Sequence, residues 1–269
     1  MLNRSKHANP KYSSQMINVR LTFLMFLGLF MVPMWSFAQD EGPNVAAQPV
    51  EAVSDESLVT LAEAPVIVEL FSSQACVFCP RADTLFNDLI EDDSVIGLSC
   101  HVDYFDVRNG ALSHKFCTDQ QTKYAQQLAS GPNYTPQIVI NGVQDVVGYK
   151  FDKVLAAVTG ARMSTVQTLK LTKGQGGNYT IKLPADITAE TNEFRLMIYD
   201  KVKDVTIADG RNKGKKMTYK NIVSTMKPLV AQNGTLTFKP EIKPANAGFV
   251  VIAQDSETGA ITGVVQGRL

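Results

Sequence analysis

The chain has 269 residues, of which 45% are hydrophobic and 19% are charged, and its acidic and basic residues are equal in number. This composition is sufficient for packed cores, and the length suggests two modest domains. The basic residues form no stripe, so neither nucleic acid nor an anionic membrane surface is expected as a partner.

Residues 1–38 have the layout of a secretory signal peptide. They include four basic residues and no acidic one, and an apolar run, Leu21 to Ala38, is broken by Pro33. Ser36 and Ala38 are the small residues that a cleavage site requires. We expect cleavage after Ala38, a secreted or periplasmic protein with net charge −4, and no membrane span in the mature chain. An uncleaved membrane anchor is the rival interpretation, although a run of ~18 residues is marginal for a span.

Residues 39–63 are acidic and lack aromatic side chains, so we interpret them as a flexible linker. Apolar periodicity then predicts strands and helices in turn. In chain order these are a strand at 66–71, a helix at 80–90, a strand at 94–103, a helix at 113–129, two strands around Asn141-Gly142 and a helix at 151–158. The order β-α-β-α-β-β-α begins with a parallel β-α-β unit, and a hairpin adds an antiparallel pair before the last helix. We therefore predict an α/β thioredoxin-like domain at 64–162.

Residues 163–269 have a different character. Short alternating stretches are separated by Gly, Asn, Asp and Pro, which predicts an all-β, sandwich-like domain. The segment Arg211 to Lys220, "RNKGKKMTYK", is a basic loop between two of these strands, and we interpret it as a solvated tip. No catalytic motif is found in this part, so its expected role is to shape partner binding or to stabilise the first domain.

The stretch Val68 to Asp83, "VELFSSQACVFCPRAD", places a C-x-x-C motif where a predicted strand meets a predicted helix. Cys76 would face the unpaired N–H groups and the positive dipole end of the helix, which favour a thiolate. Cys79 lies about one turn later, where it can resolve a mixed disulfide. The pattern favours a redox pair in which Cys76 attacks and Cys79 resolves.

Two other interpretations of this pair stay open. A permanent disulfide in an exported protein is one, although so short a loop gains little stability from closure. Metal binding is the other, with Cys76, Cys79, His101 and either Cys100 or Cys117 as candidate zinc ligands, or the two thiolates and a histidine for copper. No second C-x-x-C and no H-x-H supports a metal cluster, so we assign no metal site and no cofactor.

Cys100 and Cys117 each lie on the apolar face of a predicted element. In an exported chain they are expected to form a structural disulfide. Free core thiols and an electron relay to the first pair are the alternatives.

The sequence resembles a family of bacterial secreted proteins of unknown function with a thioredoxin-like fold. The matching stretches are "VELFSSQACVFCPRAD", "HVDYFD" (His101–Asp106), "YTPQIVING" (Tyr134–Gly142) and "VVIAQDSETGAITGVVQ" near the C-terminus. The family usually places small residues between the cysteines, where this chain has Val77 and Phe78, and Arg81 stands where a second proline is common. The resemblance implies fold and export and brings no substrate.

A thioredoxin-like fold implies further site residues. Pro136 would be a cis-proline opposite the cysteines that shapes a substrate groove, with Thr135 and Phe78 beside it. Glu69 on the first strand could relay a proton to Cys79, and a solvated carboxylate is the alternative. His101 and Asp103 could line the groove, and a strand cap followed by a turn is the alternative.

The sequence thus predicts an exported thioredoxin-like protein that exchanges thiols and disulfides with envelope proteins or small thiols. Two alternatives are a non-enzymatic envelope binding protein with an idle C-x-x-C disulfide and a copper- or zinc-binding thioredoxin-like protein. The direction of exchange is open, because Val77 and Phe78 supply no charge or extra donor between the cysteines.

Overall fold

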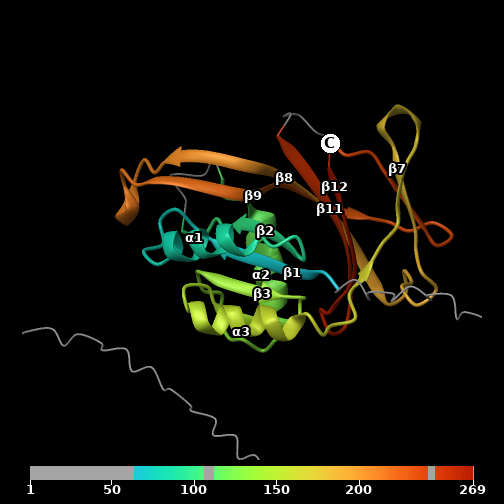
Figure 1. Ribbon diagram of the computed structural model, residues 1–269, viewed down its shortest axis with the longest axis horizontal. Coiled ribbons are helices and arrows are strands. Elements are labelled where there is room, and N and C mark those ends of the chain that lie inside the picture. Colours follow the sequence, from blue (N-terminus) through green and yellow to red (C-terminus); the bar gives the residue numbers. More distant parts are fainter. Residues whose placement is uncertain (1–63, 106–111, 242–245, 269) are drawn as a thin grey trace, which may run out of the picture. The chain divides into compact units, whose positions relative to one another are not determined.

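The computed structural model describes residues 64–105, 112–241 and 246–268 (Figure 1). The predicted signal peptide, 1–38, and the predicted linker, 39–63, lie outside these residues. All described residues belong to one compact unit, Leu58–Leu269. None of the helices within the described ranges has the length and apolar character needed to cross a membrane.

Three α-helices lie among the described residues, all before residue 162. They are α1 (Cys79–Leu89), α2 (Lys115–Gln127) and α3 (Phe151–Ala161). The strands that precede or separate them are β1 (Val66–Ser72), β2 (Val95–His101), β3 (Gln137–Ile140) and β4 (Gln144–Val147). The later strands are β5 (Gln167–Thr168), β6 (Leu171–Lys173), β7 (Tyr179–Lys182), β8 (Asn192–Thr206), β9 (Lys216–Leu229), β10 (Thr235–Phe238), β11 (Ala247–Asp255) and β12 (Ile261–Arg268).

The elements from β1 to α3 follow in the predicted order, β-α-β-α-β-β-α. β1 pairs parallel with β2 and antiparallel with β3, and β3 pairs antiparallel with β4. The turn after β3 has positive φ angles at Asn141 and Gly142, 49° and 72°, which is the conformation that an Asn-Gly turn favours. Local patterns therefore predicted this half of the chain well.

Helices cover both faces of this part of the sheet. On β1, Val68 and Leu70 belong to the core that α1 and α3 complete. The alternate residues Ile67 and Phe71 belong to the core that includes α2. Because successive side chains of a strand point to opposite faces, α1 and α3 lie on one face and α2 lies on the other.

The predicted boundary between two domains, 64–162 and 163–269, does not divide the large sheet. Five strands of the second segment extend the first sheet, and one nine-stranded sheet has the order β4-β3-β1-β2-β9-β8-β11-β12-β5. The two halves join where β9 pairs parallel with β2, at Ile222 and Ser99. Alternation of apolar residues shows that a strand is half-buried, but it carries no information about which sheet the strand joins.

A second sheet, of order β10-β7-β6, covers the far end of the large one. Its Ile181 and Leu236 share a core with Phe249 and Val251 of β11. Val250 of β11 belongs instead to the core with α2, so the small sheet packs on the face opposite α2.

β8 and β9 form a long hairpin of 15- and 14-residue strands that reaches from the large sheet past α1 (Figure 1). Asn87 of α1 donates to the carbonyl of Thr218 on β9 at 2.7 Å. Asn221 of β9 donates to the carbonyl of Gly97 on β2 at 3.0 Å. These contacts attach β9 to the later part of α1 and to β2.

Candidate functional site

The two cysteines of the C-x-x-C motif lie where β1 passes into α1. Cys76 closes a turn after β1, in which its backbone N–H donates to the Ser73 carbonyl at 3.2 Å. Cys79 is the first residue of α1. Both are free thiols. Cys76 is 7% exposed and Cys79 is fully buried, so an incoming substrate meets Cys76 first.

The surroundings shift the pKa values of the two thiols in opposite directions. A hydrogen bond from Cys79 lowers the pKa of Cys76 from 9.0 to about 6, with help from Thr135 and from the backbone N–H groups of Phe78 and Cys79, and against the effect of burial. Burial raises the pKa of Cys79, and its hydrogen bond to Cys76 raises it further. At neutral pH Cys76 is therefore the thiolate and Cys79 the thiol.

A buried carboxyl group that the sequence did not single out lies beside Cys79. Asp83 is one helical turn after Cys79 in α1 and is 2% exposed, and its Oδ1 atom has no hydrogen-bond partner within the described residues. Burial raises the pKa of Asp83 from 3.8 to about 8, the Ser72 hydroxyl lowers it in part, and the charge of Cys76 adds to the increase. A carboxyl group that titrates near neutral pH can accept a proton from a neighbouring thiol.

Glu69, which the sequence suggested as a proton relay to Cys79, is not at this site. It faces the side of β1 that α2 covers, whereas Cys79 belongs to α1 on the other side. Arg195 Nη2 donates to both carboxylate oxygens, at 3.1 and 2.9 Å, and the Tyr124 hydroxyl donates to Oε2. Glu69 is 2% exposed, so the solvated alternative is wrong as well. Its role is a buried ion pair.

The loop before β3 faces Cys76. The Thr135–Pro136 peptide bond is cis, and the Cys76 sulfur lies 3.6 Å from the Thr135 carbonyl oxygen. Phe78 is 48% exposed and stacks on Tyr149 with ring centroids 4.9 Å apart. The three residues that the sequence assigned around the cysteines thus lie together, and an exposed aromatic pair borders the motif.

His101 and Asp103 do not line this site. The His101 ring is fully buried and meets Tyr219 edge-on, with centroids 4.9 Å apart. Asp103 accepts a hydrogen bond from the Thr118 hydroxyl at 2.5 Å, which joins the end of β2 to α2. Tyr104, the next residue, donates to the Gln121 Oε1 at 3.0 Å, and burial raises its pKa to about 12.

The basic loop, expected as a solvated tip, is a second group that sequence reasoning missed. Its Arg211 and Lys213 are exposed, but Asn212 between them is 1% exposed. The Asn212 side-chain amide donates to the carbonyl oxygens of Gln74, at 2.9 Å, and Cys76, at 2.7 Å. No local pattern could have shown this contact, because Asn212 and Cys76 are 136 residues apart in sequence.

A family described as "Protein of unknown function (DUF1223)" matches residues 67–254. The chain belongs to the DUF1223 family. A search of the curated proteins finds no match. Among solved structures, a structural-genomics target from Agrobacterium tumefaciens is 24% identical with a TM-score of 0.63, over 77% of this chain and 95% of that one. HBP35 of Porphyromonas gingivalis is 15% identical with a TM-score of 0.51, over 77% and 76% of the two chains. At these identities the likeness concerns the fold alone.

In this DUF1223 chain Cys100 and Cys117 form a disulfide, as predicted. It joins the end of β2 to the first turn of α2, and both residues are buried in the core. The bond links α2 to the sheet, on the face opposite α1. The second pair is thus structural, and it is separated from Cys76 and Cys79 by the sheet.

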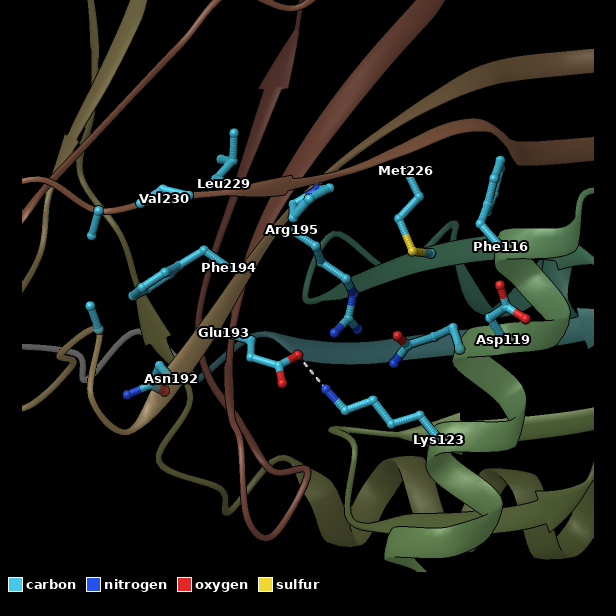
Figure 2. Close-up of a pocket in the computed structure, with 14 residues that line it drawn as sticks. Phe116, Asp119, Lys123, Asn192, Glu193, Phe194, Arg195, Met226, Leu229 and Val230 are labelled. Atoms are coloured by element: carbon cyan, nitrogen blue, oxygen red, sulfur yellow. Dashed lines mark hydrogen bonds and ion pairs between the residues drawn. The ribbon is translucent and has the colours of Figure 1, made fainter.

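A cavity of about 560 Å³ lies between α2 and the strands β8 and β9 (Figure 2). Its apolar lining includes Phe116, Phe194, Met226 and Leu229. Figure 2 shows the ion pair of Lys123 from α2 with Glu193 from β8 beside it. No residue of the C-x-x-C loop lines this cavity, so a molecule inside it would not touch Cys76.

Within the described ranges, no group of three or more His, Cys, Asp and Glu side chains is arranged to hold a metal ion. His101, a candidate ligand in the metal interpretation, is buried against Tyr219, and Cys100 and Cys117 are occupied in their disulfide. The zinc set suggested by the sequence is therefore not assembled.

Proposed function

We propose that this DUF1223 protein is an exported thiol–disulfide oxidoreductase with a thioredoxin-like arrangement around Cys76 and Cys79. The observation that carries the proposal is the asymmetry of the pair. An acidic thiol that is 7% exposed lies against the Thr135 carbonyl, and a fully buried, weakly acidic thiol lies at the start of α1. The order of elements from β1 to α3 and the parallel β1–β2 pair support the fold assignment.

The reaction has two exchange steps. The Cys76 thiolate attacks one sulfur of a substrate disulfide, the substrate S–S bond breaks, and one substrate thiolate leaves. Cys79 then loses its proton and attacks the Cys76 sulfur, which breaks the mixed disulfide and releases the second substrate thiolate. The substrate gains two electrons and the Cys76–Cys79 pair becomes a disulfide. Oxidation of a dithiol substrate passes through the same steps in reverse.

Asp83 is the group that accepts the Cys79 proton in this scheme. The high pKa of Cys79 makes it a poor nucleophile unless a base removes its proton as it attacks. Asp83 lies one turn after Cys79 in α1, and its pKa of about 8 places it in the range where it can both accept and return a proton near neutral pH.

The exposed ring pair of Phe78 and Tyr149 and the loop at Thr135 border the sulfur that reacts. An exposed aromatic pair suits an extended peptide around a cysteine better than a small charged thiol. We therefore favour envelope proteins over small thiols as substrates.

Trapping tests the assignment of roles. A Cys79→Ser variant should accumulate a mixed disulfide between Cys76 and a peptide disulfide, because the resolving thiol is gone. The matched Cys76→Ser variant should accumulate none. Equal trapping by both variants, or by neither, would contradict the proposal.

The reduction potential of the pair decides its direction. A value above roughly −200 mV indicates an oxidant or isomerase, and one near about −270 mV indicates a reductant. A value below about −300 mV with no trapped species would mean an idle disulfide. In that case the function would be a non-enzymatic binding protein, for which the cavity of about 560 Å³ is the observation in favour.

Export is part of the proposal and has its own test. Mass spectrometry of the protein from intact cells should give Gln39 as the N-terminal residue. A chain that retains residues 1–38 in the membrane fraction would remove the oxidising compartment from the argument.

A further inference from the structure

The tip of the β8–β9 hairpin is attached directly to the C-x-x-C loop. Both hydrogens of the Asn212 side-chain amide are used, one on the Gln74 carbonyl and one on the Cys76 carbonyl. The Cys76 carbonyl also accepts from the Cys79 N–H, at 3.3 Å, so the Asn212 contact at 2.7 Å is the shorter of the two. Asn212 is buried, so water does not compete for these carbonyls.

The tip itself is a small, well-connected loop. Its base is closed by two backbone hydrogen bonds that join Ile207 to Gly214 and Lys215, at 2.8 and 2.9 Å. Lys215 Nζ donates to the Asn212 Oδ1 at 2.8 Å, which orients the amide so that its N–H groups face the cysteine loop. Gly210 has a φ of 75°, a conformation that favours glycine, and it lies against the backbone of Ala75.

The rest of the hairpin holds this tip in place. β9 is attached to α1 through Asn87, which donates to Thr218 and accepts from the Lys220 N–H at 3.2 Å. Lys220 also forms an ion pair with Glu91 near the end of α1. The hairpin is therefore fixed along α1 at points well away from Cys76, and Asn212 is the contact at the sulfur end.

We propose that Asn212 is a positioning residue of the thiol site, which holds the Cys76 carbonyl so that the Cys76 sulfur stays against the backbone N–H groups at the start of α1. The inference rests on the proposed function and deepens it, because it assigns the C-terminal half of the chain a part in the chemistry. The Cys76 peptide plane sets the direction of its Cα–Cβ bond, and hence which donors its sulfur meets. These donors, on Phe78 and Cys79, stabilise the thiolate.

The experiment is a titration of the Cys76 thiolate by its ultraviolet absorbance, and by its rate of alkylation, in the reduced full-length mature protein. An Asn212→Ala variant should raise the pKa of Cys76 by about one unit, which lowers the thiolate fraction and the alkylation rate at pH 5 roughly tenfold. Asn212→Leu fills nearly the same space without a donor, and it should give the same change, so a cavity is not the cause.

The matched control is Asn87→Ala. It removes two hydrogen bonds of the same hairpin to α1, as Asn212→Ala removes two to the loop, but it does not touch Cys76. It should lower the melting temperature without changing the titration. If both Asn212 variants titrate like the Asn87→Ala protein, the positioning role is refuted while the proposed function stands. A parent protein whose Cys76 titrates at the ordinary thiol value would instead overturn the proposed function.

Discussion

Replacing Asp83 with asparagine should make the reduced protein more stable at alkaline pH. The carboxyl group has a pKa of about 8 in the folded protein and 3.8 as an ordinary value, so the folded state binds the extra proton across this window. Stability therefore falls as pH rises through the window, and the asparagine side chain removes that loss. Roughly 4 pH units at ~1.4 kcal/mol each give a difference on the order of 6 kcal/mol above pH 8.

The measurement is urea unfolding of the reduced Asp83→Asn and parent proteins at pH 5, 7 and 9. Both proteins carry the same cysteines, so their difference reports the carboxyl group together with its coupling to the two thiols. The free energy of unfolding of the variant should rise relative to that of the parent by ~1.4 kcal/mol per pH unit between pH 5 and 8, and the difference should then stay constant. A difference that does not change with pH would mean that Asp83 titrates normally, which would remove it from the proton transfer.

The same variant should slow catalysis at the second step only. Alkylation of Cys76 should change little, whereas the decay of a preformed mixed disulfide should slow, because Cys79 has lost its proton acceptor. An unchanged decay rate in Asp83→Asn would place the base elsewhere. The unfolding experiment thus tests the burial of the Asp83 carboxyl group, and the decay of the mixed disulfide tests separately whether that group accepts the Cys79 proton.

Three further predictions concern the surroundings of the site. Replacing Cys100 and Cys117 together by serine should lower the free energy of unfolding by ~3 kcal/mol for a separation of 17 residues, and equal urea midpoints would contradict the linkage. Glu69→Leu should lower the free energy of unfolding by about 3–5 kcal/mol, because it leaves the buried Arg195 guanidinium without its carboxylate partner. The same variant should leave the Cys76 titration unchanged, and a shifted titration would support a relay role for Glu69. Phe78→Ala should alter stability by less than about 0.5 kcal/mol but raise the KM for a peptide disulfide, and an unchanged KM would exclude the aromatic pair from binding.

The first half of the fold was predictable because its signals are local. Apolar spacing placed Ala82, Leu85 and Phe86 on the buried face of α1, and all three are buried there. The Asn141-Gly142 turn was equally local. The partner of β9 was not predictable: it pairs with β2, more than a hundred residues earlier, and nothing in the alternation of β9 specifies a neighbour. Whether such strands join an existing sheet or form a second domain depends on tertiary contacts, which the local pattern does not specify.

The residues of the candidate site also differ in how well local sequence signals predicted them. The C-x-x-C at a strand–helix junction placed Cys76 and Cys79 correctly, but Glu69 was named as the proton relay and Asp83 was not considered, a point that the sequence could have decided. Glu69 is three residues before Ser72, so the two face opposite sides of β1, and the α1 side belongs to Ser72. Asp83 is four residues after Cys79, which puts both on the same side of the helix. A carboxyl group that shares a helix face with a buried thiol is a better candidate base than one that shares only the neighbouring strand, because the helix spacing fixes its distance from the sulfur.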